Sequence, residues 1–197
     1  MTTIYFIRHA TPDRTSGEDA TFPLSEKGQA DVALVTAYLK DKDIDIVLSS
    51  PFKRSYDTVD DFAKSAGLTI ETIDDFRERA ISGERWIEDF ATFAKNQWAD
   101  FSYKLPCGEC LSDVQSRNIA ALDDVLTRHK GKNIAVGTHG TALSLIIHYY
   151  DPTYGIEDFM AMAGLMPWAV KMNFDDSGCI GIEKIDLFAQ YKEVTHV

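Results

Sequence analysis

The stretch Ile4–Thr11, I-Y-F-I-R-H-A-T, places a short apolar run directly before an Arg-His pair. Four apolar residues bounded by Pro12 predict a buried strand, so Arg8 and His9 fall at its carboxyl end. That edge is where ligands bind in open α/β sheets. An imidazole is a competent nucleophile toward phosphorus, and a guanidinium offers a permanent planar charge that matches phosphate oxygens. The pair alone is weak evidence, because an Arg-His pair is also common at ordinary surfaces.

The size and charge of the chain limit what it can be. Its 197 residues, 45% of them hydrophobic, are enough for a substantial core and predict one domain over residues 1–197. The net charge of -11, with no Lys/Arg-rich run, argues against binding to nucleic acid. No apolar run approaches a membrane span and the first residues do not resemble a signal peptide, so we expect a cytoplasmic protein with no membrane partner. The sequence leaves a homodimer open.

The cysteines allow two interpretations. Cys107 and Cys110 form a C-G-E-C spacing, which a redox pair or half a zinc site could use. No second Cys or His pair follows at finger-like spacing, and Pro106 stands where a thioredoxin-type strand would be needed. With Cys179 the count is odd, which is typical of free thiols in a reducing compartment. We therefore prefer two reduced thiols at a loop-to-helix boundary and predict no metal site.

Strands and helices are expected to alternate along most of the chain. The expected strands cover residues 4–7, 44–48, 69–73, 134–136, 169–174 and 179–186. The expected helices cover residues 26–40, a segment after Pro51, residues 109–130, and an apolar segment that ends at Tyr150. This order predicts an α/β three-layer sandwich with a mainly parallel sheet, helices on both faces, and an antiparallel edge from the last two strands. The aromatic-rich residues 84–106 are interpreted as a helical lid inserted over the site, although an aromatic stripe is also typical of plain core.

Two serines are predicted to cap helices. Ser25 precedes the helix at 26–40, and Ser50 precedes Pro51, which suits a first helical position. Arg54 then falls in the first turn of the second helix, at the same sheet edge as His9. The apolar stripe expected on the first helix consists of Ala30, Ala33, Leu34, Ala37 and Tyr38.

Four short motifs converge on that edge of the predicted sheet. They are R-H-A-T at 8–11, S-S-P-x-x-R at 49–54, R-E-R at 77–79 and T-H-G-T at 138–141. His139 takes the same position as His9, at the end of a strand and just before a turn. Two arginines and two histidines on neighbouring strand ends make a compact cationic pocket, which fits a phosphoryl group.

This ordered set of motifs resembles the histidine phosphatase superfamily, in the branch that includes cofactor-dependent phosphoglycerate mutases and small-molecule phosphatases. The resemblance covers nearly the whole chain. It implies that His9 is the nucleophile that becomes phosphohistidine and that Arg8 and Arg54 bind the phosphoryl oxygens. It also implies that His139 donates a hydrogen bond to those oxygens and that Glu78 is the general acid, and later the base that activates water.

The same resemblance extends to supporting residues. G-E-C at 108–110 matches the family's G-E-S, so Glu109 and the later Arg117 are interpreted as structural support. Gly140 is expected to contact substrate, and no cofactor is expected. The family's R-H-G is R-H-A here, and its phosphate-binding Asn after the nucleophile is absent. Either Thr15 replaces that Asn or the contact is missing.

The leading hypothesis is a metal-independent phosphomonoesterase of the histidine acid type that acts on a small-molecule phosphomonoester. A phosphoglycerate mutase is the second. A silent phospho-ligand-binding module is the third, and it is disfavoured because His9, Glu78 and His139 are all present. The segment between Glu78 and Gly108 suits an apolar or aromatic leaving alcohol at least as well as a second phosphate. The sequence therefore favours phosphate release without dependence on 2,3-bisphosphoglycerate, and it does not identify the physiological substrate.

Overall fold

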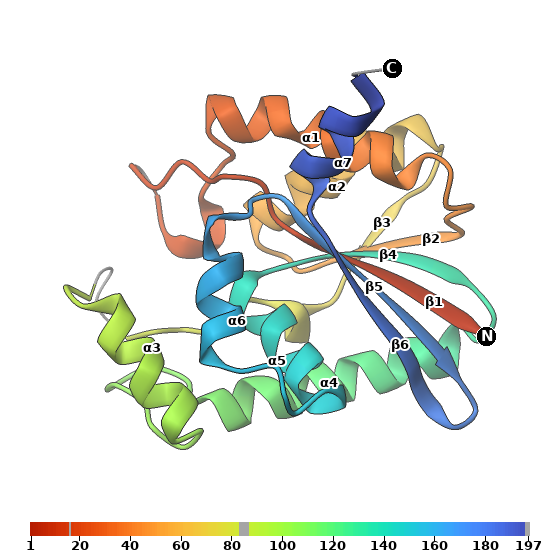
Figure 1. Cartoon of the computed structure of the whole chain (residues 1–197). Coiled ribbons are helices and arrows are strands. Elements are labelled where there is room, and N and C mark those ends of the chain that lie inside the picture. Colours follow the sequence, from red (N-terminus) through yellow and green to blue (C-terminus); the bar gives the residue numbers. More distant parts are fainter. Residues whose placement is uncertain (16, 83–86, 196–197) are drawn as a thin grey trace.

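A six-stranded sheet forms the centre of the molecule (Figure 1). The structure is a computed structural model that describes residues 1–15, 17–82 and 87–195. The strands are β1 (Thr2–Arg8), β2 (Ile46–Ser49), β3 (Ile70–Thr72), β4 (Asn133–Thr138), β5 (Trp168–Asp175) and β6 (Gly178–Ile185), in the spatial order β3-β2-β4-β1-β5-β6. The first four pair in parallel, whereas β5 runs antiparallel to both β1 and β6. The predicted mainly parallel sheet with an antiparallel edge is confirmed.

Helices cover both faces of this sheet, as predicted. They are α1 (Glu26–Leu39), α2 (Lys53–Ser65), α3 (Phe90–Ala99), α4 (Leu111–Arg128), α5 (Gly140–Tyr150), α6 (Ile156–Ala161) and α7 (Leu187–Thr195), with 3-10 turns η1 (Asp19–Thr21), η2 (Asp74–Phe76) and η3 (Met162–Gly164). Figure 1 shows α1, α2 and α7 on one face and α4, α5 and α6 on the other. Alternate residues of β1 point into the two layers, since Ile4 and Phe6 join one core cluster and Tyr5 and Ile7 the other.

The start of α1 is as predicted, but its buried face is not. Ser25 Oγ accepts a hydrogen bond from the Gly28 N–H at 3.1 Å, which confirms the cap. The predicted stripe is wrong for its three alanines, which are exposed, whereas Leu34 and Tyr38 are half-buried and pack against the core. The buried residues are Gly28, Val32, Val35 and Leu39. The larger valines and leucine bury more apolar area than alanines could, so they determine which face packs on the sheet.

The segment predicted as a lid contains one helix, α3. Residues 83–86, at its beginning, lie outside the part that the structure describes. Phe93, Ala94 and Gln97 of α3 are buried, and Trp98 packs against Tyr154 and Phe159. Some of these aromatic side chains therefore belong to the core, and the lid remains a prediction.

The three thiols are free. Cys107 is exposed, Cys179 is half-buried, and Cys110 is buried at the position just before α4, with its Sγ 3.1 Å from Ser112 Oγ. Within the described residues, no group of three or more His, Cys, Asp or Glu side chains could hold a metal ion. Nor does any described helix combine the length and the apolar character that crossing a membrane requires.

Candidate active site

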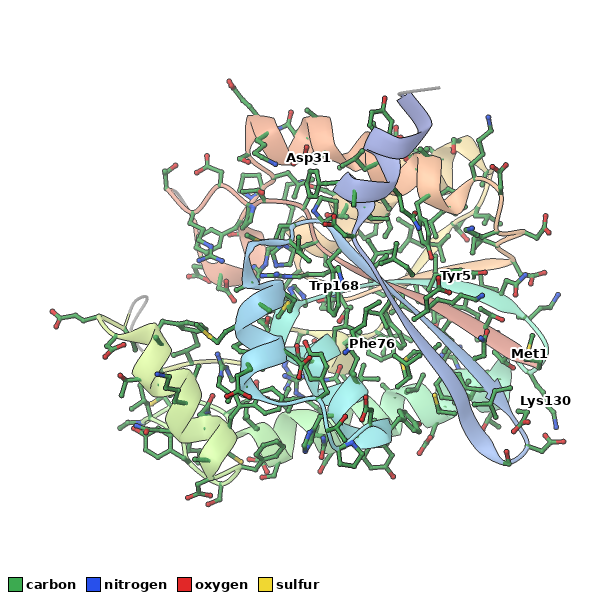
Figure 2. The ribbon with its side chains drawn as sticks, viewed as in Figure 1. Met1, Tyr5, Asp31, Phe76, Lys130 and Trp168 are labelled. Carbon is green, nitrogen blue, oxygen red and sulfur yellow. The ribbon has the colours of Figure 1, made fainter. Side chains whose placement is uncertain are left out.

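The predicted site residues, apart from Thr15, come together at the carboxyl ends of β1, β2 and β4. His9 follows β1 and His139 follows β4, and the two strands pair in parallel with Arg8 opposite Thr138. The His9 N–H donates to the Thr138 carbonyl at 3.0 Å, and the two imidazole centroids lie 5.2 Å apart. Trp168, which pairs with Arg8 across β1 and β5, marks this end of the sheet in Figure 2, whereas Met1 and Lys130 mark the opposite end.

His9 is held as a neutral imidazole. Its Nδ1 lies 2.8 Å from the Ala10 carbonyl oxygen, which can only accept, so Nδ1 carries the proton. Nε2 keeps its lone pair and accepts a 3.3 Å hydrogen bond from Arg54 Nε. Burial, and then the charges of Arg54 and Arg8, hold the pKa of His9 well below its ordinary value. An unprotonated Nε2 is what attack on phosphorus requires.

The Arg8 side chain is buried, and part of its guanidinium is hydrogen-bonded to backbone carbonyl groups. Its Nη1 donates to the carbonyl oxygens of Met162, Ala163 and Leu165 at 2.6, 3.1 and 3.0 Å, whereas its Nε has no hydrogen-bond partner among the described residues. Burial lowers the pKa of Arg8 to about 10, so the guanidinium remains charged at neutral pH. A Cβ at Gly140 would lie 3.2 Å from that Nε, so glycine allows α5 to begin close to the guanidinium.

Arg54 binds a carboxylate that sequence reasoning missed. Its Nη1 donates to the Asp19 carbonyl and lies 3.1 Å from Asp19 Oδ1. The Arg54 side chain is 5% exposed and that of Asp19 is 58% exposed. Asp19 belongs to η1, between β1 and α1, and the sequence alone shows it only as one acid in that connection. An anion that binds Arg54 must therefore compete with this carboxylate.

Replacing Asp19 with Asn is expected to tighten the binding of inorganic phosphate. Because the Asp19 carboxylate is exposed to solvent, its ion pair with Arg54 should contribute about 1 kcal/mol or less, so the dissociation constant should fall roughly two- to five-fold. Calorimetric titration of phosphate into the protein measures it. Glu18→Gln, which removes an acid from the same loop, is the matched control, and unchanged or weaker phosphate binding by Asp19→Asn would contradict the competition.

Glu78 follows η2 in the chain, and its side chain reaches the N-terminus of α5. Its Oε2 accepts from the Thr141 N–H at 3.0 Å and its Oε1 from the Arg79 N–H at 2.8 Å. The R-E-R motif and the T-H-G-T motif are thus joined by a direct hydrogen bond. The predicted convergence of these two motifs is present in the structure.

Glu109 and Arg117 brace the loop that carries Glu78, as their predicted structural role requires. Arg117 Nε and Nη2 each donate to the Glu109 carboxylate at 3.0 Å. Arg117 also donates to the carbonyl oxygens of Asp75, Arg77 and Glu78, at 2.7, 2.9 and 3.3 Å. Burial acts to raise the pKa of Glu109, but the bonds from Arg117 and from the Ala80 N–H outweigh it and hold that pKa below its ordinary value. Glu109 is therefore a poor general acid.

Thr15 is not brought to this cluster. It is exposed, and its Oγ1 donates to Asp13 Oδ1 at 2.7 Å. The same bond, with a second from the Thr15 N–H, lowers the pKa of Asp13, so Asp13 is also a poor acid. The substrate contact of Thr15 remains a prediction without a supporting contact.

The predicted cap at Ser50 is wrong. The residue before α2 is Phe52, and no side chain caps the helix. Ser50 Oγ instead lies 2.7 Å from His139 Nε2 and accepts from the Phe52 N–H at 3.2 Å. Sequence reasoning assigned this hydroxyl to the helix because nothing in the local sequence shows that β4 delivers an imidazole beside it.

Two buried histidines should make the fold sensitive to acid. Burial first, and then nearby cations, lower the pKa of both His9 and His139 well below 6.5. Below about pH 6.5 the unfolded chain binds protons that the folded chain refuses, so the free energy of unfolding falls as the pH falls. For two such groups the loss is about 2–3 kcal/mol between pH 7.5 and 5.5. Urea unfolding across that range measures it, and His9→Asn should show about half the change. An unchanged slope in that variant would count against the neutral histidine.

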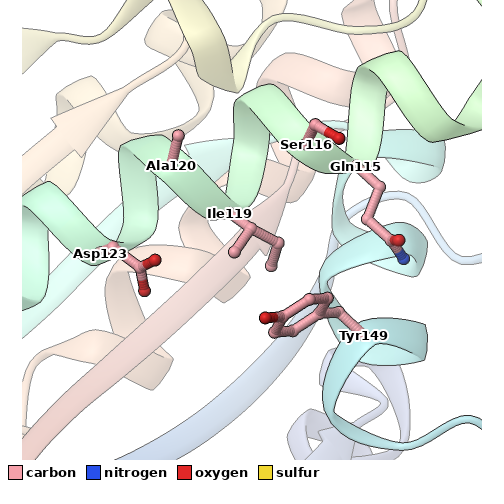
Figure 3. A pocket seen from close by; sticks show the side chains of 6 residues that line it. All are labelled: Gln115, Ser116, Ile119, Ala120, Asp123 and Tyr149. Carbon is pink, nitrogen blue, oxygen red and sulfur yellow. The ribbon is translucent and has the colours of Figure 1, made fainter.

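A surface pocket between α4 and α5 lies apart from these residues (Figure 3). Its lining is formed by Gln115, Ser116, Ile119, Ala120, Asp123 and Tyr149. The lining contains one acid and no cation, so it does not suit a phosphoryl group.

Comparison with known proteins agrees with this geometry. The chain is 28% identical over 128 residues to phosphoserine phosphatase 1 of Hydrogenobacter thermophilus, a match that spans 59% of this chain and 58% of that protein. It is 28% identical over 160 residues to the probable phosphoglycerate mutase GpmB of Yersinia pestis, covering 75% of this chain and 74% of that protein. The solved structure of Bacillus stearothermophilus YhfR has the same fold, with a TM-score of 0.77, 20% identity, and 91% and 94% of the two chains covered. Residues 4–171 match the profile of the histidine phosphatase superfamily (branch 1), and the chain belongs to that family.

Proposed function

We propose that the chain is a metal-independent phosphomonoesterase that hydrolyses a small phosphorylated metabolite through a phosphohistidine at His9. The observation that carries the proposal is the unprotonated Nε2 of a buried His9, 3.3 Å from Arg54 Nε and beside a second imidazole. A buried neutral imidazole can act as a nucleophile. The arginines around it disfavour the binding of a cationic substrate. A phosphoryl group is the ligand that such a set of groups suits.

The reaction proceeds in two displacements. His9 Nε2 attacks phosphorus, the P–O bond to the alcohol breaks, and Glu78 gives its proton to the leaving oxygen. A water oxygen then attacks phosphorus while Glu78 takes a proton from that water, and the P–N bond to His9 Nε2 breaks. This step releases inorganic phosphate and restores His9 and the protonated Glu78. Arg8 and Arg54 offset the charge on the phosphoryl oxygens, the role that metal ions have in other phosphoryl-transfer enzymes.

The mutase alternative depends on cations in the segment that follows Glu78. Arg79 is a buried cation in this segment, with 3% of its surface exposed, and the second phosphate of a mutase substrate could bind such a cation. Its Nη1, however, already donates to Gln97 Oε1, and its guanidinium lies 5.0 Å from the centre of the Phe93 ring. Lys95 and Lys104 are exposed, and Arg85 lies outside the described residues. This arrangement supports hydrolysis over phosphoryl return.

A paired assay tests the proposal. The protein is incubated with 3-phosphoglycerate and 2,3-bisphosphoglycerate while 2-phosphoglycerate and free phosphate are followed together, and a panel of phosphorylated metabolites is screened beside it with and without EDTA. We expect phosphate release to exceed isomerisation and to survive EDTA, because no step needs a metal. His9→Gln, prepared in the same way, measures any contaminating phosphatase. Faster isomerisation would establish a mutase, and a loss in EDTA that a divalent ion restores would contradict metal independence.

A further inference from the structure

Ser50 and His139 form a fully buried pair at the junction of β2 and β4. Both residues are 0% exposed, and Ser50 Oγ lies 2.7 Å from His139 Nε2. The Ser50 N–H donates to the Gly137 carbonyl at 2.9 Å, so the pairing of the two strands fixes the hydroxyl relative to the imidazole. The ring is also enclosed by Phe52 and His9, whose ring centroids each lie 5.2 Å from its own.

The hydrogen bonds of Ser50 decide which nitrogen of His139 carries the proton. Ser50 Oγ has two partners among the described residues, the Phe52 N–H, which can only donate, and His139 Nε2. If Nε2 also donated, the hydroxyl hydrogen would be buried without an acceptor. If the hydroxyl donates to Nε2, the hydroxyl and Nε2 are both satisfied, the ring proton is on Nδ1, and this N–H is the one group of the pair left unpaired. The second arrangement is the more stable one.

His139 Nδ1 is then a donor with no hydrogen-bond partner among the described residues. Burial, and then the charge of Arg54, keep the pKa of His139 well below its ordinary value, so the ring is neutral and has one N–H only. In a neutral ring the tautomer decides whether this nitrogen can donate to an oxygen or only accept. A buried donor left without a partner is costly, and a phosphoryl oxygen would satisfy it.

We propose that Ser50 is a positioning residue, which holds His139 as the Nδ1–H tautomer so that this N–H donates to a phosphoryl oxygen. The inference rests on the proposed function for its purpose, but the tautomer itself does not depend on activity. Ser50 acts only through His139, by selecting its proton position and by fixing the angle of the ring.

Nitrogen-15 NMR of histidine-labelled protein tests the tautomer directly. The chain has five histidines, and His139 is assigned from the loss of its signals in His139→Gln or from contacts of its ring protons with the Phe52 ring. We expect a protonated Nδ1 and an unprotonated Nε2 in the wild type. Ser50→Ala should move the proton to Nε2 or give a mixture, whereas Ser50→Thr should retain the wild-type pattern. A wild-type His139 protonated on Nε2 would overturn the inference without any variant.

Phosphate binding and turnover test the role. Adding inorganic phosphate should shift the His139 Nδ1–H resonance in the wild type, and Ser50→Ala should lower kcat for an aryl phosphate by about 10- to 100-fold, less than the loss of a whole transition-state donor. Ser144→Ala removes another fully buried hydroxyl, one that is bonded to Tyr154, and should leave the His139 tautomer unchanged. A tautomer that Ser50→Ala does not alter, or a His139 signal that phosphate does not move, would reject the positioning role. A wild type with the expected tautomer but no phosphatase activity would reject the proposed function instead.

Discussion

Replacing His9 with Gln is expected to reduce turnover of every phosphomonoester by on the order of 10⁴–10⁶-fold, the range typical of losing a nucleophile. The variant should also fail to incorporate acid-labile phosphate from a labelled substrate. The reason is that Nε2 of His9 is unprotonated and lies 3.3 Å from Arg54 Nε, so the proposed bond to phosphorus cannot form without it. Rapid quenching in base followed by measurement of bound label gives the result.

His129→Gln is the matched control for this experiment. His129 follows α4, at the end of the sheet that lies away from the site, and its Nε2 contacts Arg128 rather than any site residue. The His129→Gln variant should incorporate as much labelled phosphate as the wild type. Undiminished labelling of His9→Gln would remove the nucleophile assignment, and labelling that moves to His139 would give that histidine the role.

Much of the fold could be predicted because local patterns and the sheet agree. The residues of Ile4–Ile7 are all buried. In a chain where strands alternate with helices, a short continuous apolar run is typical of a central strand that is covered on both faces. The cap at Ser25 was also readable, since its partner Gly28 lies three residues away. The buried face of α1 was not, because alanine and valine both fit a helical stripe and only the packed sheet distinguishes them.

The site residues also divide into those that local sequence patterns predict and those that they do not. His9, Arg54 and His139 follow from their places at strand ends and in a first helical turn. Ser50 and Asp19 do not, because each acts on a partner that the fold brings from a distant part of the chain. Long-range contacts of this kind leave no periodic signal, so a hydroxyl near a helix start is read as a cap and an acid in a loop as solvated.

Glu78→Gln is expected to separate substrates by their leaving groups. An alkyl phosphate needs a proton on the departing oxygen, whereas an activated aryl phosphate does not, and proton donation of this kind is typically worth about 10²–10⁴-fold. The amide oxygen of Gln can still accept from one of the two N–H groups that Glu78 binds, Thr141 or Arg79, so the variant loses one hydrogen bond and otherwise keeps the side chain in place. We expect kcat for the alkyl ester to fall by that factor and kcat for the aryl ester to fall much less.

Glu109→Gln is the informative comparison, because Glu109 shapes the same loop without supplying a proton. Its carboxylate receives two 3.0 Å bonds from Arg117, which also holds the Glu78 carbonyl, so its loss should loosen the loop and slow both classes of substrate by a similar factor. The ratio of the two kcat values therefore distinguishes proton donation from positioning. A slope of log kcat against leaving-group pKa that steepens in Glu78→Gln and not in Glu109→Gln would assign the acid to Glu78. Parallel slopes in the two variants would mean that Glu78, like Glu109, serves only to hold the loop in place.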